Sequence, residues 1–220
     1  MFKILFEDPH LIVLSKPAGL LSQGEHSGDE NLVDLLRSHF GRHYVGLIHR
    51  LDRNTSGLMV VAKRTKAAQR LTESLQQGDL QRNYLAWVHG FLTEEKHWTH
   101  FLSKNEKTNT VAVVKNPNQG KKSSLIARPI ARGQWESFPL TLVEFILETG
   151  RSHQIRVQAT FEGFPLLGDS KYGSHETRSS FFRTALHSHF LSFPHPMSKE
   201  ILQWRDELPQ DMNQIRQLPL

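Results

Sequence analysis

One carboxylate in this sequence stands between two arginines, in the stretch His49–Gly57, which reads HRLDRNTSG. Small hydroxyl-bearing residues and a glycine follow Asp52, and an apolar segment begins directly after them. A carboxylate that neighbouring cations keep ionised, on a loop supported by a rigid strand, can attack an electrophilic carbon. The same residues also suit a polar turn in which Asp52 caps main-chain N–H groups and Gly57 supplies an unusual φ. The residue types alone leave both interpretations open.

Several other kinds of site are excluded by the composition and motifs. The chain has no cysteine, so it cannot form a disulfide, a thiolate zinc site, a cysteine nucleophile or an iron–sulfur cluster. It also lacks a Gly-rich phosphate loop and the motifs HExxH and GxSxG. His187 and His189 would lie on one face of a strand and could ligate a metal. Because no third ligand stands at a supporting spacing, a structural or solvated pair is the better interpretation.

The elements that would position such a loop can be predicted from apolar periodicity. Asn31 can cap one helix, and Thr65 can cap a second helix that ends at Gly78. The first helix would carry Leu32, Leu35, Leu36 and Phe40, and the second Ala68, Leu71 and Leu75. Few helices among many strands, without regular alternation, predict an α+β fold. The predicted strands are the short apolar runs Leu11–Leu14, Leu58–Val61, Tyr84–Val88, Val111–Val114 and Leu140–Leu147.

The charge balance favours a nucleic-acid partner. Among the 220 residues, Lys+Arg 27 exceed Asp+Glu 22, which gives a formal net charge of +5. Such a balance suits a polyanion, although many basic proteins bind none. No apolar run approaches the roughly 20 residues of a membrane span, and the N-terminal segment lacks the shape of a signal peptide. We therefore expect a soluble protein of the cytoplasm with no membrane partner.

The stretch His49–Gly57 resembles the HRLDxxTSG signature of the RluA-type pseudouridine synthases, a bacterial family that isomerises uridine in ribosomal and transfer RNA. Further segments resemble the other motifs of this family, in the order in which the family carries them. Matches extend from about Glu7 to Pro209. The companion segments are Lys16–Gly19 (KPAG), Arg82–Ala86 (RNYLA), Thr149–Arg156 (TGRSHQIR), Gly168-Asp169, Tyr172-Gly173, Leu186-His187 and Phe193–Pro196.

The resemblance implies the pseudouridine synthase fold, a mixed and largely antiparallel central sheet flanked by helices and loops. It also implies that residues 1–220 form a single catalytic domain, without the separate N-terminal RNA-binding domain of larger relatives. One segment conflicts with this expectation, because apolar residues alternate as in a strand where the family has a helix. They are Ile155, Val157, Ala159 and Phe161, and Gly163 could end such a helix.

The resemblance also assigns three catalytic residues. Asp52 matches the essential aspartate, which acts on the ribose of a flipped uridine; whether it adds to the sugar or deprotonates it stays open. Arg156 matches an arginine whose charge would keep that carboxylate ionised, with a phosphate contact or a surface ion pair as the alternative. Tyr84 matches a tyrosine whose ring can stack on the base and whose hydroxyl can help move the carbon-5 proton.

Substrate contacts are expected from two places in the sequence. His49 and Arg50 flank Asp52 and would help hold the extruded nucleotide or its phosphates, whereas Thr55 would shape the loop at the substrate rather than react. The polar, Lys-rich segment Lys104–Ser124 predicts a long hairpin or excursion. Its candidate RNA contacts include Lys115, Lys121 and Lys122, and a solvated basic loop is the alternative.

Pseudouridine formation gains and loses no atoms, so the resemblance implies no cofactor, metal or redox carrier. The expected partner is ribosomal or transfer RNA, and we expect a monomer. Two other functions stay open. A catalytically inactive RNA-binding module on the same fold would show no turnover, and a base-excising N-glycosylase would release free uracil.

Overall fold

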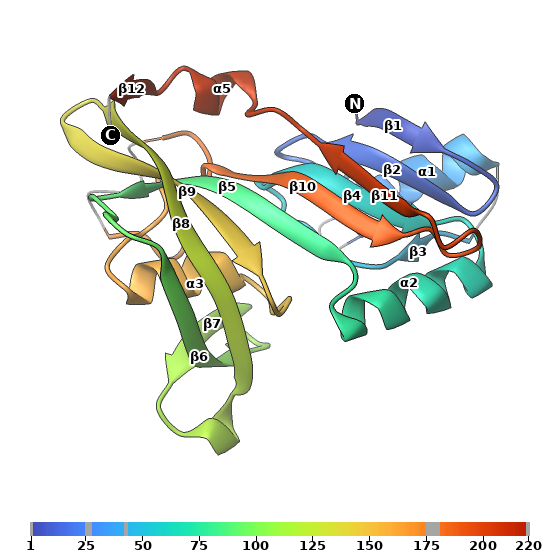
Figure 1. Ribbon diagram of the computed structural model, residues 1–220, viewed down its shortest axis with the longest axis horizontal. Helices are drawn as coiled ribbons and strands as arrows, with labels where there is room; N and C mark the ends of the chain where they lie inside the picture. Colours follow the sequence, from blue (N-terminus) through green and yellow to red (C-terminus); the bar gives the residue numbers. More distant parts are fainter. Residues whose placement is uncertain (1, 25–27, 42–43, 175–180, 219–220) are drawn as a thin grey trace. The chain divides into compact units, whose positions relative to one another are not determined.

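The computed structural model describes residues 2–24, 28–41, 44–174 and 181–218, and these form two compact units (Figure 1). The first unit combines the described residues of Met1–Arg82 with His187–Glu207. The second combines Asn83–Leu186 with the described part of Leu208–Leu220. The single catalytic domain expected for residues 1–220 stays a prediction.

The first unit is built on strands in the order β1-β2-β4-β10. The pairs β1–β2 and β2–β4 are antiparallel, whereas β4 and β10 are parallel. A short β3 pairs with β4, and β11 pairs with β10. The runs predicted as strands at Leu11–Leu14 and Leu58–Val61 are confirmed. The bounds are β1 Lys3–Glu7, β2 Leu11–Lys16, β3 Gly46–Leu47, β4 Ser56–Ala62, β10 Leu186–Pro194 and β11 Ile201–Arg205.

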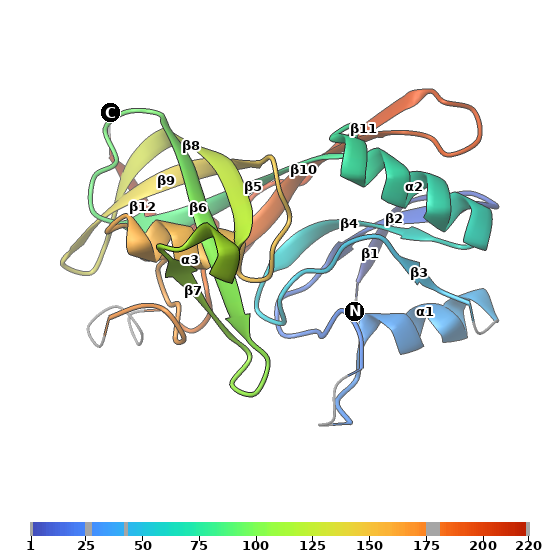
Figure 2. The same ribbon diagram turned by 90° about the horizontal axis from the view of Figure 1, so that it is seen from below.

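Two helices cover this sheet, α1 (Leu32–Phe40) and α2 (Thr65–Gln77). Ala67 and Leu71 of α2 pack against alternate residues of β2 and β4, which are Leu11, Val13, Leu58 and Val60. The intervening residues are also fully buried and face the other side of the sheet; they are Ile12, Leu14, Met59 and Val61. Figure 2 shows α2 and α1 on opposite sides of β2 and β4. Burial on both faces makes β4 a rigid support for the loop before it.

The helix ends agree with the sequence except at one position. The side chain of Asn31 accepts the main-chain N–H of Asp34, as expected of the cap of α1. Gly78 ends α2 at φ 86°, as predicted. The prediction of Thr65 as the cap of α2 is wrong. Thr65 is already helical, and the extended residue before the helix is Arg64, which makes no side-chain cap bond.

The second unit is built on strands in the order β5-β9-β8-β6-β7, and each neighbouring pair is antiparallel. The strands predicted at Tyr84–Val88, Val111–Val114 and Leu140–Leu147 are confirmed. The segment Lys104–Ser124 is a hairpin of β6 and β7 followed by a 3-10 turn, η1, and the start of β8. The bounds are β5 Gln81–His89, β6 Lys96–Asn105, β7 Thr110–Val114, η1 Pro117–Gln119, β8 Lys121–Trp135, β9 Phe138–Leu147 and β12 Arg216–Leu218, which pairs with β8.

The segment with conflicting signals is a helix, α3 (Gln154–Phe161), as the family resemblance implied. The strand-like alternation misleads because Gln154–Ala159 are all buried, so the apolar residues mark no single face. Val157 packs with Leu102 of β6 and Val111 of β7. A short α5 (Gln210–Asn213) follows later. The predicted α+β class with a mixed, largely antiparallel sheet is confirmed, and no helix in the described part of the chain is long and apolar enough to cross a membrane.

Candidate functional site

Asp52 lies half-buried on the turn that leads into β4. The main-chain N–H of Thr55 donates to the carbonyl of Asp52 at 3.0 Å and closes the turn. Leu51 and Thr55 are buried, while Arg53 and Asn54 are exposed at its tip. We call Leu51–Ser56 the Asp52 loop.

The residue before Asp52 is clamped by a buried serine. The hydroxyl of Ser22 donates to the carbonyl of Leu51 at 2.7 Å and accepts the N–H of Leu51 at 3.2 Å. One side chain therefore satisfies both main-chain groups of Leu51, as a neighbouring strand would. This contact fixes the chain direction at the point where it enters Asp52.

The residue after Asp52 is held by the KPAG turn. Lys16 is fully buried, and its Nζ donates to the carbonyls of Pro17, Leu20 and Arg53 at 2.9, 2.7 and 3.2 Å. The N–H of Gly19 donates to the same Arg53 carbonyl at 2.8 Å, and Nε of Arg53 donates back to the Gly19 carbonyl at 3.1 Å. A buried ammonium needs such acceptors, so Lys16 ties the turn and the loop together.

The end of the loop is fixed to β10. Ser56 pairs with His187 in the parallel ladder, and its hydroxyl lies 2.9 Å from Nδ1 of His187. The predicted unusual φ of Gly57 is confirmed at 111°, and a Cβ there would lie 2.2 Å from the carbonyl oxygen of Ser188. Only glycine fits this close approach. Both sides of Asp52 are thus anchored by buried contacts.

His49 is buried and contacts β4. Its Nε2 accepts the N–H of Val60 at 3.3 Å. Loss of hydration on burial, together with the charge of Arg82, lowers the pKa of His49 to about 3. The ring is therefore neutral at physiological pH. Arg50 is exposed, and Thr55 is buried. The structure brings Asp52, His49, Arg50 and Thr55 together in one segment of the first unit, and their predicted contacts with substrate stay predictions.

The second unit contains Tyr84 and Arg156. Tyr84 is buried on β5, opposite Phe145 of β9. Arg156 is only 9% exposed on α3, and its Nε and Nη2 donate to the two carboxylate oxygens of Asp169, each at 2.8 Å. Burial opposes ionisation of Asp169, but Arg156 and the N–H groups of Tyr172 and Lys171 together lower its pKa. This buried pair differs from the surface ion pair that the sequence left open.

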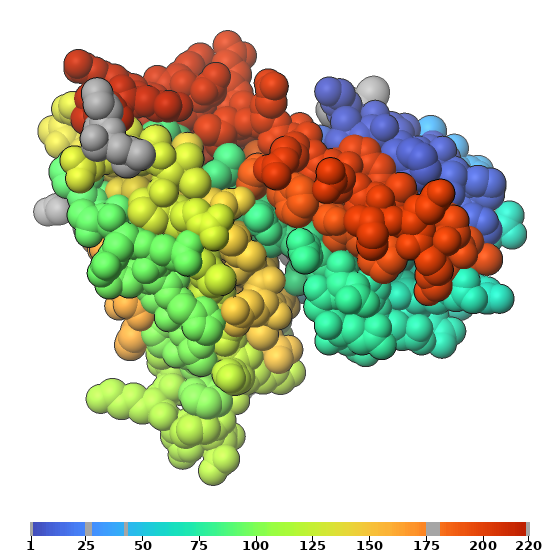
Figure 3. All heavy atoms as spheres, in the orientation of Figure 1, coloured from blue at the N-terminus to red at the C-terminus, as the bar shows by residue number. Residues whose placement is uncertain are grey.

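The predicted RNA-contact lysines lie together on the second unit. Lys115 follows β7, and Lys121 and Lys122 open β8; all three are exposed. The yellow-green side chains of this segment project from the body of the unit in Figure 3. Nε of Arg151 donates to the carbonyl of Lys122 at 3.4 Å and adds another exposed cation nearby. Arg151 belongs to the motif segment Thr149–Arg156, but no sequence feature predicted that it would lie beside Lys122.

His187 and His189, the two possible metal ligands, contact different neighbours. Nδ1 of His187 faces the Ser56 hydroxyl, and its Nε2 lies 3.7 Å from Asp206. His189 is half-buried beside the ring of Phe190. Within the described residues, no group of three or more histidine, aspartate or glutamate side chains is placed to hold a metal ion.

Comparison with known proteins gives one consistent result. Residues 10–160 match the family model described as RNA pseudouridylate synthase. Ribosomal large subunit pseudouridine synthase D of Nitrosomonas europaea is 39% identical, over 99% of this chain and 66% of its own length. The uncharacterized RNA pseudouridine synthase YjbO of Bacillus subtilis is 34% identical, over 96% of this chain and 74% of its own. The chain thus spans about two thirds to three quarters of these relatives.

Solved structures agree on the fold. Human RNA pseudouridylate synthase domain containing 1 matches with a TM-score of 0.84 at 24% identity, over 100% of this chain and 90% of that one. Human RNA pseudouridylate synthase domain containing 4 matches with a TM-score of 0.77 at 21% identity, over 96% and 90%. The fold that the motifs implied is confirmed.

Proposed function

Because the chain belongs to the RNA pseudouridylate synthase family, we propose that it isomerises uridine to pseudouridine in RNA, with Asp52 acting on the ribose of a flipped uridine. Two similar proteins are named for the ribosomal large subunit, which favours ribosomal over transfer RNA as the substrate. The proposal includes a monomeric protein of the cytoplasm, with residues 1–220 as a single catalytic domain.

The reaction breaks the bond between N1 of uracil and C1′ of ribose, turns the base and joins C5 to C1′. The proton on C5 then leaves, and N1 gains one. Uracil is already a stabilised leaving group, so one carboxylate can suffice, whereas glycosidases use two for an alcohol. The family resemblance assigns Tyr84 to the base and the C5 proton, and Arg156 to the active-site cation, and the proposal keeps these roles.

The observation that carries the proposal is the anchoring of the Asp52 loop. Contacts from the buried side chains of Ser22 and Lys16 hold the main chain of Leu51 and Arg53 on either side of the carboxylate. An attacking group gains most of its rate advantage from being held in place before the reaction. A polar surface turn would need no buried serine and lysine to fix its main chain, so the geometry favours a reactive role for Asp52 over a purely structural one.

We expect Asp52→Asn to abolish the reaction, because the amide keeps the shape of the side chain but lacks its negative charge. The assay measures tritium released from carbon-5-tritiated total RNA of cells that lack this protein. RNA binding should stay within a few fold of wild type. Asp29→Asn is the matched control, since this exposed carboxylate pairs with Arg53 of the same loop at 2.8 Å; it should keep most of the activity.

Each alternative function has its own signature in that assay. Wild-type protein that binds RNA and releases no tritium would be an inactive RNA-binding module. Free uracil among the products would identify an N-glycosylase. Tritium release by Asp52→Asn at the wild-type rate would assign the attack to another residue.

We also expect Lys115, Lys121 and Lys122 to neutralise RNA phosphates. Each such contact releases counterions, so changing all three to alanine should reduce the logarithmic salt slope of RNA binding by about two to three units. Affinity should fall alike for target and non-target RNA, because phosphate contacts do not distinguish sequence. A variant with Lys3, Lys66 and Lys96 changed to alanine removes the same charge elsewhere and serves as the control. An equal slope in the two variants would mean that the hairpin is only a solvated basic loop.

A further inference from the structure

Asp169 is a fully buried carboxylate that the reaction as proposed does not use. Both of its oxygens accept hydrogen bonds from Arg156 at 2.8 Å, through Nε and Nη2. This parallel, two-bond geometry fixes the plane of a guanidinium as well as its distance. The pair with Asp169 therefore fixes how the guanidinium of Arg156 is oriented.

Asp169 is also held by main-chain groups that do not involve Arg156. Its Oδ1 also accepts the N–H groups of Lys171 and Tyr172 at 3.0 and 3.1 Å, and its carbonyl accepts the N–H of Gly173 at 2.9 Å. The turn begins at Gly168 with φ 69°, where a Cβ would lie 2.1 Å from the carbonyl oxygen of Arg183. The carboxylate therefore belongs to a tight turn that requires glycine, and its position is set by the main chain.

Tyr172 holds the guanidinium from a second direction. The guanidinium carbon of Arg156 lies 5.0 Å from the centre of the Tyr172 ring, within the range of a cation–π contact. The Tyr172 hydroxyl accepts the N–H of Val111 at 2.9 Å and lies 2.6 Å from Nδ1 of His153. The ring is thus tied to β7 and to the residue that precedes α3.

We propose that Asp169 and Tyr172 are positioning residues that fix the guanidinium of Arg156 for the isomerisation, an inference that rests on the role proposed for Arg156. A long arginine side chain has many rotamers, and a displacement of about 1 Å at a reacting group can cost about 100-fold in rate. The Asp169 carboxylate and the Tyr172 ring restrict the rotamers of Arg156 from two sides. The motif Gly168-Asp169 with Tyr172-Gly173 thereby acquires a function in catalysis.

The first test is Asp169→Asn, assayed with the same tritiated total RNA. The amide places an N–H group against a donor of Arg156 and removes the negative charge. We expect kcat to fall roughly 10- to 100-fold while the apparent KM for RNA changes less than about threefold. Asp169→Glu keeps the charge but moves it by one methylene, so it should lose less. Tyr172→Phe keeps the ring and should lose a few fold.

A matched control separates positioning from loss of a buried ion pair. Arg183 and Asp211 form another two-bond pair in the same unit, with contacts of 2.5 and 3.0 Å; Arg183 is buried and Asp211 is half-buried. Asp211→Asn should lower the melting temperature and leave kcat near wild type. If it lowers kcat as much as Asp169→Asn does, any loss of a buried pair is sufficient and the positioning role is wrong.

The decisive measurement is a double-mutant cycle with Arg156→Met. If Asp169 acts through Arg156, adding Asp169→Asn to Arg156→Met should cause no further loss of kcat. Additive losses would overturn the inference. If Asp169→Asn does not fold at the assay temperature, Asp169→Glu takes its place in the cycle. An Arg156→Met variant with wild-type kcat would instead refute the role proposed for Arg156, whereas a wild-type rate in Asp169→Asn alone would refute only this inference.

Discussion

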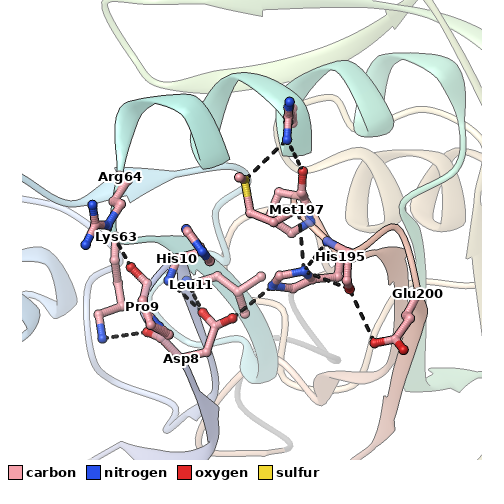
Figure 4. Close-up of polar contacts among 12 residues, drawn as sticks. Asp8, Pro9, His10, Leu11, Lys63, Arg64, His195, Met197 and Glu200 are labelled. Atoms are coloured by element: carbon pink, nitrogen blue, oxygen red, sulfur yellow. Dashed lines mark hydrogen bonds and ion pairs between the residues drawn. The ribbon is translucent and has the colours of Figure 1, made fainter.

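The two ends of β4 in the first unit each have an aspartate nearby, and the chain holds them in different ways. Before β4, the Asp52 loop is fixed through the neighbours of Asp52, by contacts to Leu51, Arg53 and Ser56. Beyond β4, Asp8 is itself the anchor. Its Oδ1 accepts the N–H groups of His10 and Leu11 at 2.7 and 2.8 Å, and its Oδ2 lies 2.9 Å from Nε2 of His195 (Figure 4).

Basic side chains at the Asp8 end also bind main-chain groups. Lys63, Arg64 and Arg70 donate to the carbonyls of Asp8, Pro9 and Pro196 at 2.8, 3.0 and 2.7 Å, as Figure 4 shows in part. The contacts of Lys63 and Arg64 join the β1–β2 turn to the end of β4, and the contact of Arg70 joins the β10–β11 loop to α2. The difference teaches that the carboxylate of Asp8 holds the main chain directly, whereas the loop that carries Asp52 is also held through main-chain groups of its neighbours Leu51 and Arg53.

The Asp8 end also contains a serine, a histidine and an aspartate in line. The Ser198 hydroxyl lies 3.1 Å from Nδ1 of His195, whose Nε2 faces Asp8. However, Nδ1 already accepts the N–H groups of Met197 and Ser198 at 3.3 and 3.0 Å. A ring nitrogen that already accepts two main-chain hydrogen bonds is a poor general base. This arrangement therefore stabilises the β10–β11 loop and is not a catalytic triad.

Among the variants that test this comparison of the two ends of β4, Lys16→Met should have the largest effect. Methionine keeps the length of the side chain but leaves the carbonyls of Pro17, Leu20 and Arg53 without the ammonium. We expect the free energy of unfolding to fall by about 2–4 kcal/mol and kcat to fall at least about 10-fold, because Arg53 adjoins Asp52. Urea unfolding and tritium release measure the two effects. A loss of stability with wild-type kcat in the folded protein would break the comparison, since the loop would not need its anchors.

The family, the enzyme class and the fold class could be predicted from the sequence because the motifs that carry them are local, and the comparisons confirm them. The contacts that hold Asp52 could not be predicted. Ser22 and Leu51 are 29 positions apart, and Ser56 and His187 are 131 apart. No spacing rule indicates which distant side chain meets a given carbonyl. The pairing of Arg156 with Asp169 was missed although both motifs were visible, because no spacing rule indicates that the two side chains meet.

The next effect in size concerns the buried ring of His49, just before the Asp52 loop. The pKa of His49 is lowered from 6.5 to about 3 in the folded protein. Between these values the unfolded chain binds more protons, so the free energy of unfolding should fall as the pH falls, with a slope approaching about 1.4 kcal/mol per pH unit. His49→Gln removes this titration, and its amide oxygen can still accept the N–H of Val60.

Urea unfolding at pH 7 and pH 5 compares the wild type with His49→Gln. The wild type should lose about 2 kcal/mol more than the variant over this range. Equal losses would mean that another group controls the acid sensitivity of the first unit. That result would weaken the view that the Asp52 end depends on neutral, buried support.

The smallest expected effect tests the other end of β4 through Asp8→Asn. Burial opposes ionisation, but the N–H groups of Leu11 and His10 and the ring of His195 lower the pKa of Asp8 below its ordinary value. Its stabilising contribution is therefore present above the unfolded pKa of about 4 and is lost as the pH falls through the lower folded value. At pH 7 the variant should lose about 1 kcal/mol of unfolding free energy, and this deficit should shrink below about pH 4. Because Asp8 anchors structure and takes no part in the proposed reaction, kcat should stay near wild type. A tenfold fall in kcat without unfolding would show that the two ends of β4 are coupled, and the division between an anchoring and a reacting aspartate would fail.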